Sequence, residues 1–184
     1  MFKDIISILE QIEHIAPESK WNSSINKDAL NEILIANSVT NTELLTLYTW
    51  RNGNMHSSVE QNPEFCSFGY ILPIDVATKI YNEKEFLGFK NDGLFPFLCD
   101  FRGDYLLLKI GSPEQPVYIY SPSLFIVAPE AIFENLSTFL QSIYDCYLSK
   151  AYFIQNNKLK VDMDAENSIF HKHSDLYTIW SENN

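Results

Sequence analysis

The chain has 184 residues, of which 46% are hydrophobic, and this is enough to bury a core and to exclude a disordered chain. Asp and Glu number 24 against 13 Lys and Arg, so the formal net charge is -11. Such a charge disfavours direct binding to nucleic acid, because phosphate backbones are repelled, and it attracts basic proteins. Composition also leaves open that the charge serves solubility alone.

The cysteines and the N-terminal residues indicate a cytoplasmic protein. Cys66, Cys99 and Cys146 are widely spaced without a CxxC motif, which argues against a disulfide framework and a structural zinc site. We expect Cys99 and Cys146 to be buried and inert, because they lie in apolar patterns. Residues 1–15 do not have the pattern of a signal peptide, and no apolar run is long enough to span a bilayer.

Helices are predicted for the first part of the chain. Apolar residues at helical spacing predict a helix over residues 2–15, and Pro17 follows its end. A second helix is predicted within residues 26–38, where Asn26 can serve as the N-cap.

A third helix has sequence signals at both of its ends. The stretch "TNTE" predicts a capping box, in which Thr40 and Glu43 satisfy each other's backbone amides. The stretch "RNG" predicts the end of the helix, because Gly53 can adopt the left-handed conformation past the C-cap.

The middle of the chain changes from helical to strand periodicity. Residues 68–72 predict a strand, and residues 73–86 predict a helix capped by Asp75. Four further strands are then predicted, at residues 94–98, 105–110, 117–121 and 124–128. Short strands joined by tight turns predict an antiparallel meander, with residues 105–110 at its centre because both faces of that run are apolar.

The helical pattern returns at Leu136, with Asn135 as the expected N-cap, and a short helix and a terminal segment at 177–180 follow. The fold class predicted is α+β: a mostly antiparallel sheet of about five or six strands, flanked by N-terminal, middle and C-terminal helices. We expect one domain over residues 1–184, with a core at about 25–150 and a C-terminal extension at 152–184.

Several stretches, in order along the chain, carry a family resemblance. They are "LYTWRNG" (47–53), "FGYILPI" (68–74), "FPFLCDFRGDYLLLKI" (95–110), "PVYIYSP" (116–122), "NLSTFLQSIYDCYL" (135–148) and the tail "VDMDAEN…YTIW". Together they resemble the SUKH superfamily, which includes bacterial toxin-immunity proteins and yeast regulators of cell-wall synthesis. One departure is Phe101, in a turn where the family more often has small or polar residues.

The resemblance implies an α+β fold and a binding role without catalysis. Bacterial members typically bind and neutralise a toxin encoded beside them, and an acidic immunity protein suits a basic nuclease. The contact residues expected are Trp50, Arg51, Asn52, Asp100, Phe101, Arg102 and Asp104, with Gly53 and Gly103 as structural turn residues.

Individual residues among these have alternative interpretations. Asp100 and Asp104 could be a pair of catalytic acids, but a turn in which Asp100 forms an Asx-type bond and Gly103 has a positive φ is the stronger interpretation. Trp50 belongs either to the core or to the wall of a binding groove. Tyr118 and Tyr120 share one face of their strand, which could serve an interface.

The sequence predicts no catalytic residues, no cofactor and no metal site. The "HKH" at 171–173 has the wrong spacing for two ligands on one helix face, and residues 162–167 are expected to be a solvated helix start. Two other functions stay open: a regulatory scaffold that binds a housekeeping protein, and a small hydrolase that uses Asp100 and Asp104.

Overall fold

The computed structural model describes residues 4–55, 62–83, 87–111 and 115–178. Trp180, the first residues of the helix predicted over 2–15 and the last residues of the helix predicted over 73–86 lie outside the described residues. The helices are α1 Ile5–Ile15, α2 Lys27–Ala36, α3 Thr42–Trp50, α4 Ile74–Asn82, α5 Leu87–Asn91, α6 Leu136–Ser149 and α7 Met163–His173. Within the described residues, none of these helices has the length and apolar character needed to cross a membrane.

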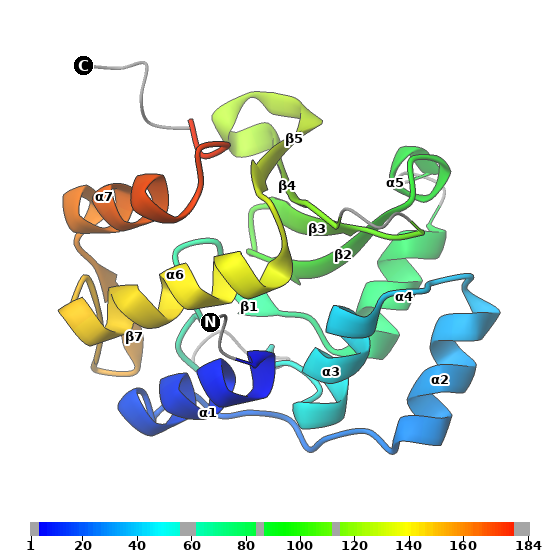
Figure 1. Ribbon diagram of the computed structural model, residues 1–184, viewed down its shortest axis with the longest axis horizontal. Helices are drawn as coiled ribbons and strands as arrows, with labels where there is room; N and C mark the ends of the chain where they lie inside the picture. The colour runs from blue at the N-terminus through cyan, green and yellow to red at the C-terminus, as the bar shows by residue number, and fades with distance from the viewer. Residues whose placement is uncertain (1–3, 56–61, 84–86, 112–114, 179–184) are drawn as a thin grey trace.

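Five strands form one antiparallel sheet in the order β1-β2-β3-β4-β5 (Figure 1). They are β1 Tyr70–Ile71, β2 Leu94–Cys99, β3 Tyr105–Lys109, β4 Val117–Ser121 and β5 Ile126–Phe133. The predicted α+β class is therefore confirmed, and β3 lies at the centre of the sheet as expected. The strand predicted over 68–72 is shorter than expected, since only Tyr70 and Ile71 pair with β2.

The main core lies between the sheet and α6, which runs across one face of the sheet (Figure 1). Phe139 of α6 contacts the rings of Phe97 in β2 and Phe133 in β5, at centroid distances of 6.0 and 5.4 Å. Helix α1 packs against α6, so the N-terminal helix belongs to the same core.

The opposite face of the sheet carries a smaller cluster. Phe89 of α5 packs there with Leu94 and Leu107, and the partly buried Tyr118 and Tyr120 lie against them. The remaining residues of β4, Val117, Ile119 and Ser121, are buried on the main-core side. The alternation predicted for this strand is confirmed, and its two tyrosines are partly covered by α5.

The helix caps are partly as predicted. The side chains of Asn26 and Asn135 accept hydrogen bonds from the first amides of α2 and α6, which confirms both N-caps. The capping box at 40–43 is wrong: Asn41 is the N-cap of α3, and its Oδ1 accepts from Leu44 N at 2.8 Å. Glu43 therefore lies one position nearer the helix start than a capping box requires, and it accepts from the backbone of α6 instead, at 3.2 Å.

The start of α4 also differs from the prediction. Pro73 is the N-cap residue, and Asp75 lies in the first turn without acting as the cap. The Ile74 amide donates instead to Asn52 Oδ1 at 2.8 Å. The cap of α4 therefore comes from a residue distant in sequence, which a local pattern does not reveal.

The C-terminal extension packs on the rest of the molecule. It begins with a hairpin that the sequence analysis missed, β6 Tyr152–Gln155 and β7 Lys158–Val161. Asn156 and Asn157 form its two-residue turn with φ values of 53° and 58°, which suits the twist of a tight hairpin. Phe170 of α7 and the following Tyr177 are buried in the main core.

Candidate binding site

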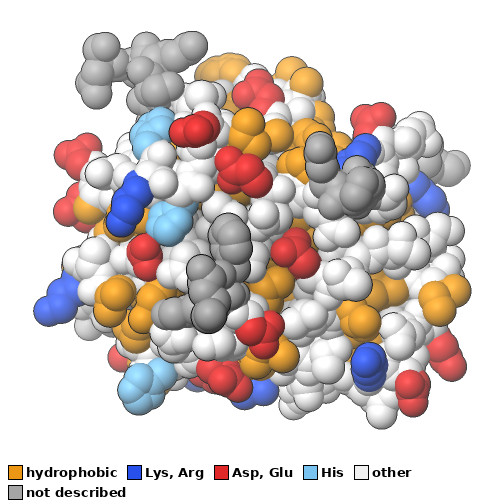
Figure 2. All heavy atoms as spheres, viewed as in Figure 1, with side chains coloured by type: hydrophobic (Ala, Val, Ile, Leu, Met, Phe, Trp, Pro, Cys, Tyr) orange, Lys and Arg blue, Asp and Glu red, His pale blue; other side chains and the backbone are white. Residues whose placement is uncertain are grey.

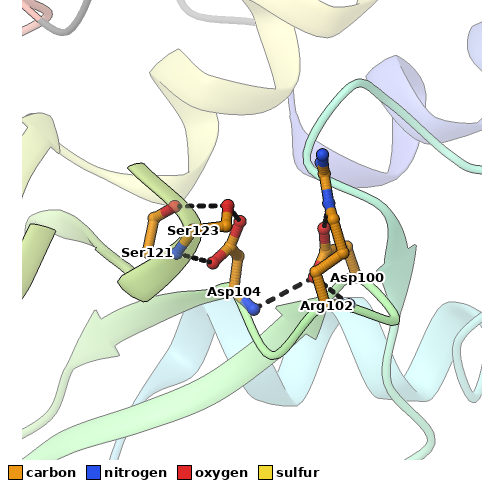
Figure 3. A network of polar contacts seen from close by, with 5 residues as sticks. All are labelled: Asp100, Arg102, Asp104, Ser121 and Ser123. Carbon is orange, nitrogen blue, oxygen red and sulfur yellow. Dashed lines mark hydrogen bonds and ion pairs between the residues drawn. The ribbon is translucent and has the colours of Figure 1, made fainter. Parts of the chain in front are cut away.

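Asp100 organises the turn between β2 and β3. Its Oδ1 accepts from the amides of Arg102 and Asp104 at 2.8 and 3.0 Å, and its Oδ2 accepts from Arg102 Nε at 2.6 Å (Figure 3). The Asp100 side chain is 7% exposed, whereas that of Arg102 is 72% exposed. Gly103 has a φ of 89°. The Asx-type turn with a glycine at positive φ is therefore confirmed.

Asp104 links this turn to the segment after β4. Its carboxylate accepts from the amide of Ser123 at 3.2 Å and also from the Ser123 hydroxyl, as Figure 3 shows. Ser123 belongs to the short 3-10 helix η3 Pro122–Leu124. Both aspartates are thus engaged by hydrogen-bond donors of the turn and of η3, which agrees with a structural role for the two side chains.

A pocket of about 380 Å³ opens beside these two carboxylates. Residues 64–68, the 100–104 turn, β4, η3, β7 and α7 all contribute to its wall. Its charged residues are Glu64, Asp100, Arg102, Asp104 and Glu166, and its apolar and aromatic residues are Phe68, Ile119, Leu124, Leu159, Val161, Met163 and Tyr177. The lining therefore carries four carboxylates against one guanidinium, between apolar surfaces.

Glu166 is a buried carboxylate in the wall of this pocket. It is 1% exposed, and it accepts a hydrogen bond from the Tyr152 hydroxyl, while Ser67 also bonds to it. Burial raises the pKa of Glu166, and the two hydrogen bonds oppose part of that rise. Residues 162–167 are therefore only partly a solvated helix start: Asp162 caps α7, but Glu166 faces inward.

Glu64 is the second glutamate of the pocket, and it is half-buried. Burial raises its pKa, the neighbouring Asp100 raises it further, and the charge of Arg102 opposes the rise. In the part of the chain that the structure describes, the Glu64 carboxylate forms neither a hydrogen bond nor an ion pair, unlike the carboxylates of Asp100, Asp104 and Glu166.

An exposed apolar tip borders the pocket. It consists of Leu124, Phe125 and Val127, whose exposed fractions are 39%, 91% and 71%, and we call it the hairpin tip. Leu124 also lines the pocket. Phe125 has a φ of 62°, an unusual conformation for a bulky residue that costs roughly 1 kcal/mol. The strand predicted over 124–128 begins only at Ile126, which leaves Leu124 and Phe125 outside the sheet, while Val127 lies near the start of β5.

The predicted contact residues at 50–52 have structural partners. Trp50 is buried against Trp21, at a ring-centroid distance of 4.7 Å. Arg51 lies over the Trp50 ring and pairs with Glu13 at 3.3 Å, and Asn52 caps α4. These three residues do not line the pocket, so the structure does not join them to Asp100, Arg102 and Asp104.

Gly53 and Phe101 have clear local surroundings. Gly53 has a φ of 72°, and a side chain there would begin 2.4 Å from the carbonyl oxygen of Ile71, so only glycine fits. Phe101 is half-exposed on the turn, and its ring meets the ring of Tyr70 at a centroid distance of 5.0 Å.

The thiols and histidines do not form a reactive centre in the described part of the chain. All three cysteines are free and buried, and burial raises the pKa of Cys99 to about 12, so its thiol stays protonated. His173 pairs with Asp145 at 2.8 Å. Within the described ranges, no three His, Cys, Asp or Glu side chains are grouped to hold a metal ion.

Glu64, Ser67, Glu166 and Phe125 were missed as site residues by the sequence analysis. The apolar run "LFIVA" indicates a strand and does not reveal which of its residues stay exposed. Comparison of the chain with models of protein families and with curated proteins finds no match.

Proposed function

We propose that this chain is an immunity-type protein, which binds a cognate toxin and neutralises it by direct contact. The observation that carries this proposal is the acidic pocket with the exposed hairpin tip at its border. Carboxylates around a recess steer a basic partner toward it, and an exposed aromatic side chain supplies the desolvated anchor that dominates binding energy in many interfaces.

The charge of the chain indicates the kind of partner. Two copies at -11 each repel one another, so the exposed apolar tip is better matched by a basic protein than by a second copy. Figure 2 shows acidic side chains spread among apolar ones over the face that includes α6, with Lys and Arg mostly toward the periphery of the view. A basic nuclease acting in the cytoplasm is a toxin with the required charge.

The resemblance of the chain to the SUKH superfamily supports the same proposal from its motifs. It implies neutralisation without catalysis, and the hydrogen bonds of Asp100 and Asp104 agree with a structural role for both. No cofactor enters the proposed mechanism.

The test is capture of the partner from the native host with tagged protein, followed by mass spectrometry. We expect a basic protein in stoichiometric amount, and less of it at high salt, because salt screens the charges that attract it. Phe125→Asp should abolish capture of that protein. The matched control is Ile35→Asp, which places the same charge on a 73% exposed apolar residue of α2, at the opposite end of the molecule from α7 (Figure 1).

Three results would count against the proposal. The first is an empty capture, and the second is capture of acidic housekeeping proteins alone, which favours the regulatory scaffold. The third is equal loss of the basic protein with Phe125→Asp and Ile35→Asp, since the hairpin tip would then have no special role.

A further inference from the structure

The carboxylates of the pocket differ in how well their charges are satisfied. Asp100 is paired with Arg102, and Asp104 is bonded by the amide and hydroxyl of Ser123. Glu64 is half-buried in the same pocket, where Asp100 repels its charge and the nearby Arg102 offsets part of that repulsion without forming an ion pair with it. Its carboxylate therefore has capacity for an incoming donor.

Glu166 adds a second, independent observation. It is 1% exposed, and the groups that bond to it, the hydroxyls of Tyr152 and Ser67, are both neutral. A carboxylate buried without a countercharge is costly, and a cation entering the pocket would offset that cost. The buried end of the pocket thus favours a positively charged ligand.

The shape of the pocket limits the size of that ligand. Its volume of about 380 Å³ lies at the lower end of the range of roughly 300–1,000 Å³ that small-molecule sites occupy. Phe68, Leu124 and Tyr177 give it apolar walls. A guanidinium is planar and weakly hydrated and has an apolar stem, so it suits such walls better than the compact, strongly hydrated ammonium of lysine.

We infer that this pocket takes an arginine side chain presented by the partner, with Glu64 as its main ligand and Glu166 at the buried end. The inference rests on the proposed function for the source of the arginine. The pair that Arg102 forms with Asp100 at the pocket is an internal example of the same complementarity. The hairpin tip then packs on the partner beside the inserted side chain.

The experiment titrates the full chain, labelled with ¹⁵N, with Nα-acetyl-arginine amide and follows the backbone amides by NMR. We expect saturable shifts at residues around the pocket, including Ser67, Asp104 and Ser123. Nα-acetyl-citrulline amide, which has nearly the same shape without the charge, should give no such shifts. Glu64→Gln should weaken the binding about tenfold, because one charge-assisted contact is lost, whereas Glu32→Gln on α2 should leave it unchanged.

Each alternative result overturns the inference. Equal shifts with the citrulline amide would mean that the pocket does not select the charge. Unchanged binding by Glu64→Gln, with the variant's spectrum showing a folded chain, would remove Glu64 as the ligand. Tighter binding of Nα-acetyl-lysine amide than of the arginine amide would show that the pocket prefers an ammonium group to a guanidinium group. Because the titration uses no partner, its failure is distinct from a failed capture.

Discussion

Glu166 is a carboxylic acid in a position that is otherwise typical of an apolar side chain. Its exposed fraction is 1%, and the neighbours that perturb or bond to it are neutral in the folded chain. Tyr152 donates to it, and burial raises the pKa of Tyr152, so the phenol stays protonated. The pKa values of Cys66 and Cys146, which are coupled to Glu166, are raised as well. Of Glu166, Tyr152, Cys66 and Cys146, Glu166 is therefore the group that loses its proton at the lowest pH.

The stability of the protein should depend on pH through Glu166. Its pKa is raised in the folded chain above the ordinary value of 4.5, so the folded state binds more protons than the unfolded state between these two values. Stability therefore falls as pH rises through that window. We expect Glu166→Gln to be more stable than the natural chain at pH 8, by roughly 1 kcal/mol, because the buried charge is removed.

Urea unfolding at pH 8 and at pH 4.5 measures this effect. The advantage of the Gln variant should shrink at pH 4.5, where the carboxyl is about half protonated in the unfolded chain and more than half protonated in the folded chain. A stability difference that is the same at both pH values would show that Glu166 carries no buried charge at pH 8.

Helix α3 illustrates how a neighbouring residue can replace a predicted cap. Asn41 accepts from the Leu44 amide, and its Nδ2 donates to Gln115 at 2.9 Å, which ties the start of the helix to the segment before β4. Thr40 is exposed and is not the cap. Asn is at least as good an N-cap as Thr, so local propensity did not separate the two.

We expect Asn41→Ala to lower the free energy of unfolding by about 1 kcal/mol or more, because the cap and the bond to Gln115 are both lost. Thr40→Ala is the matched control and should leave stability within about 0.5 kcal/mol of the natural chain. Thermal or urea unfolding of the two variants compares them directly. A larger loss in the Thr40 variant would restore the capping box that the sequence predicted.

The elements that local patterns predicted well are those with regular periodicity. Helix α6 and strands β2, β3 and β4 follow their apolar patterns closely. The β6–β7 hairpin was missed although its signal is present: two asparagines between short runs that contain apolar residues, each free to adopt a positive φ. The start of β5 was misplaced because "LFIVA" continues the apolar pattern through the hairpin tip.

The pocket is formed only when the whole molecule is folded. Its wall combines residues 64–68, the 100–104 turn, the end of β4 and α7, which lie far apart in the sequence. The Asx-type turn could be predicted because all its bonds are local. That Glu64 and Glu166 line the same pocket could not be predicted, because it depends on how α7 and the extension pack on the sheet. The contact role of Trp50, Arg51 and Asn52 stays a prediction.

The central claim is neutralisation of a basic toxin through the pocket and the hairpin tip. The most direct measurement is growth of a bacterium that expresses the captured partner, alone and together with this chain. We expect that the partner alone stops growth, that the natural chain and Ile35→Asp restore it, and that Phe125→Asp does not. A partner that is harmless alone, or whose toxicity this chain does not relieve, would contradict this claim.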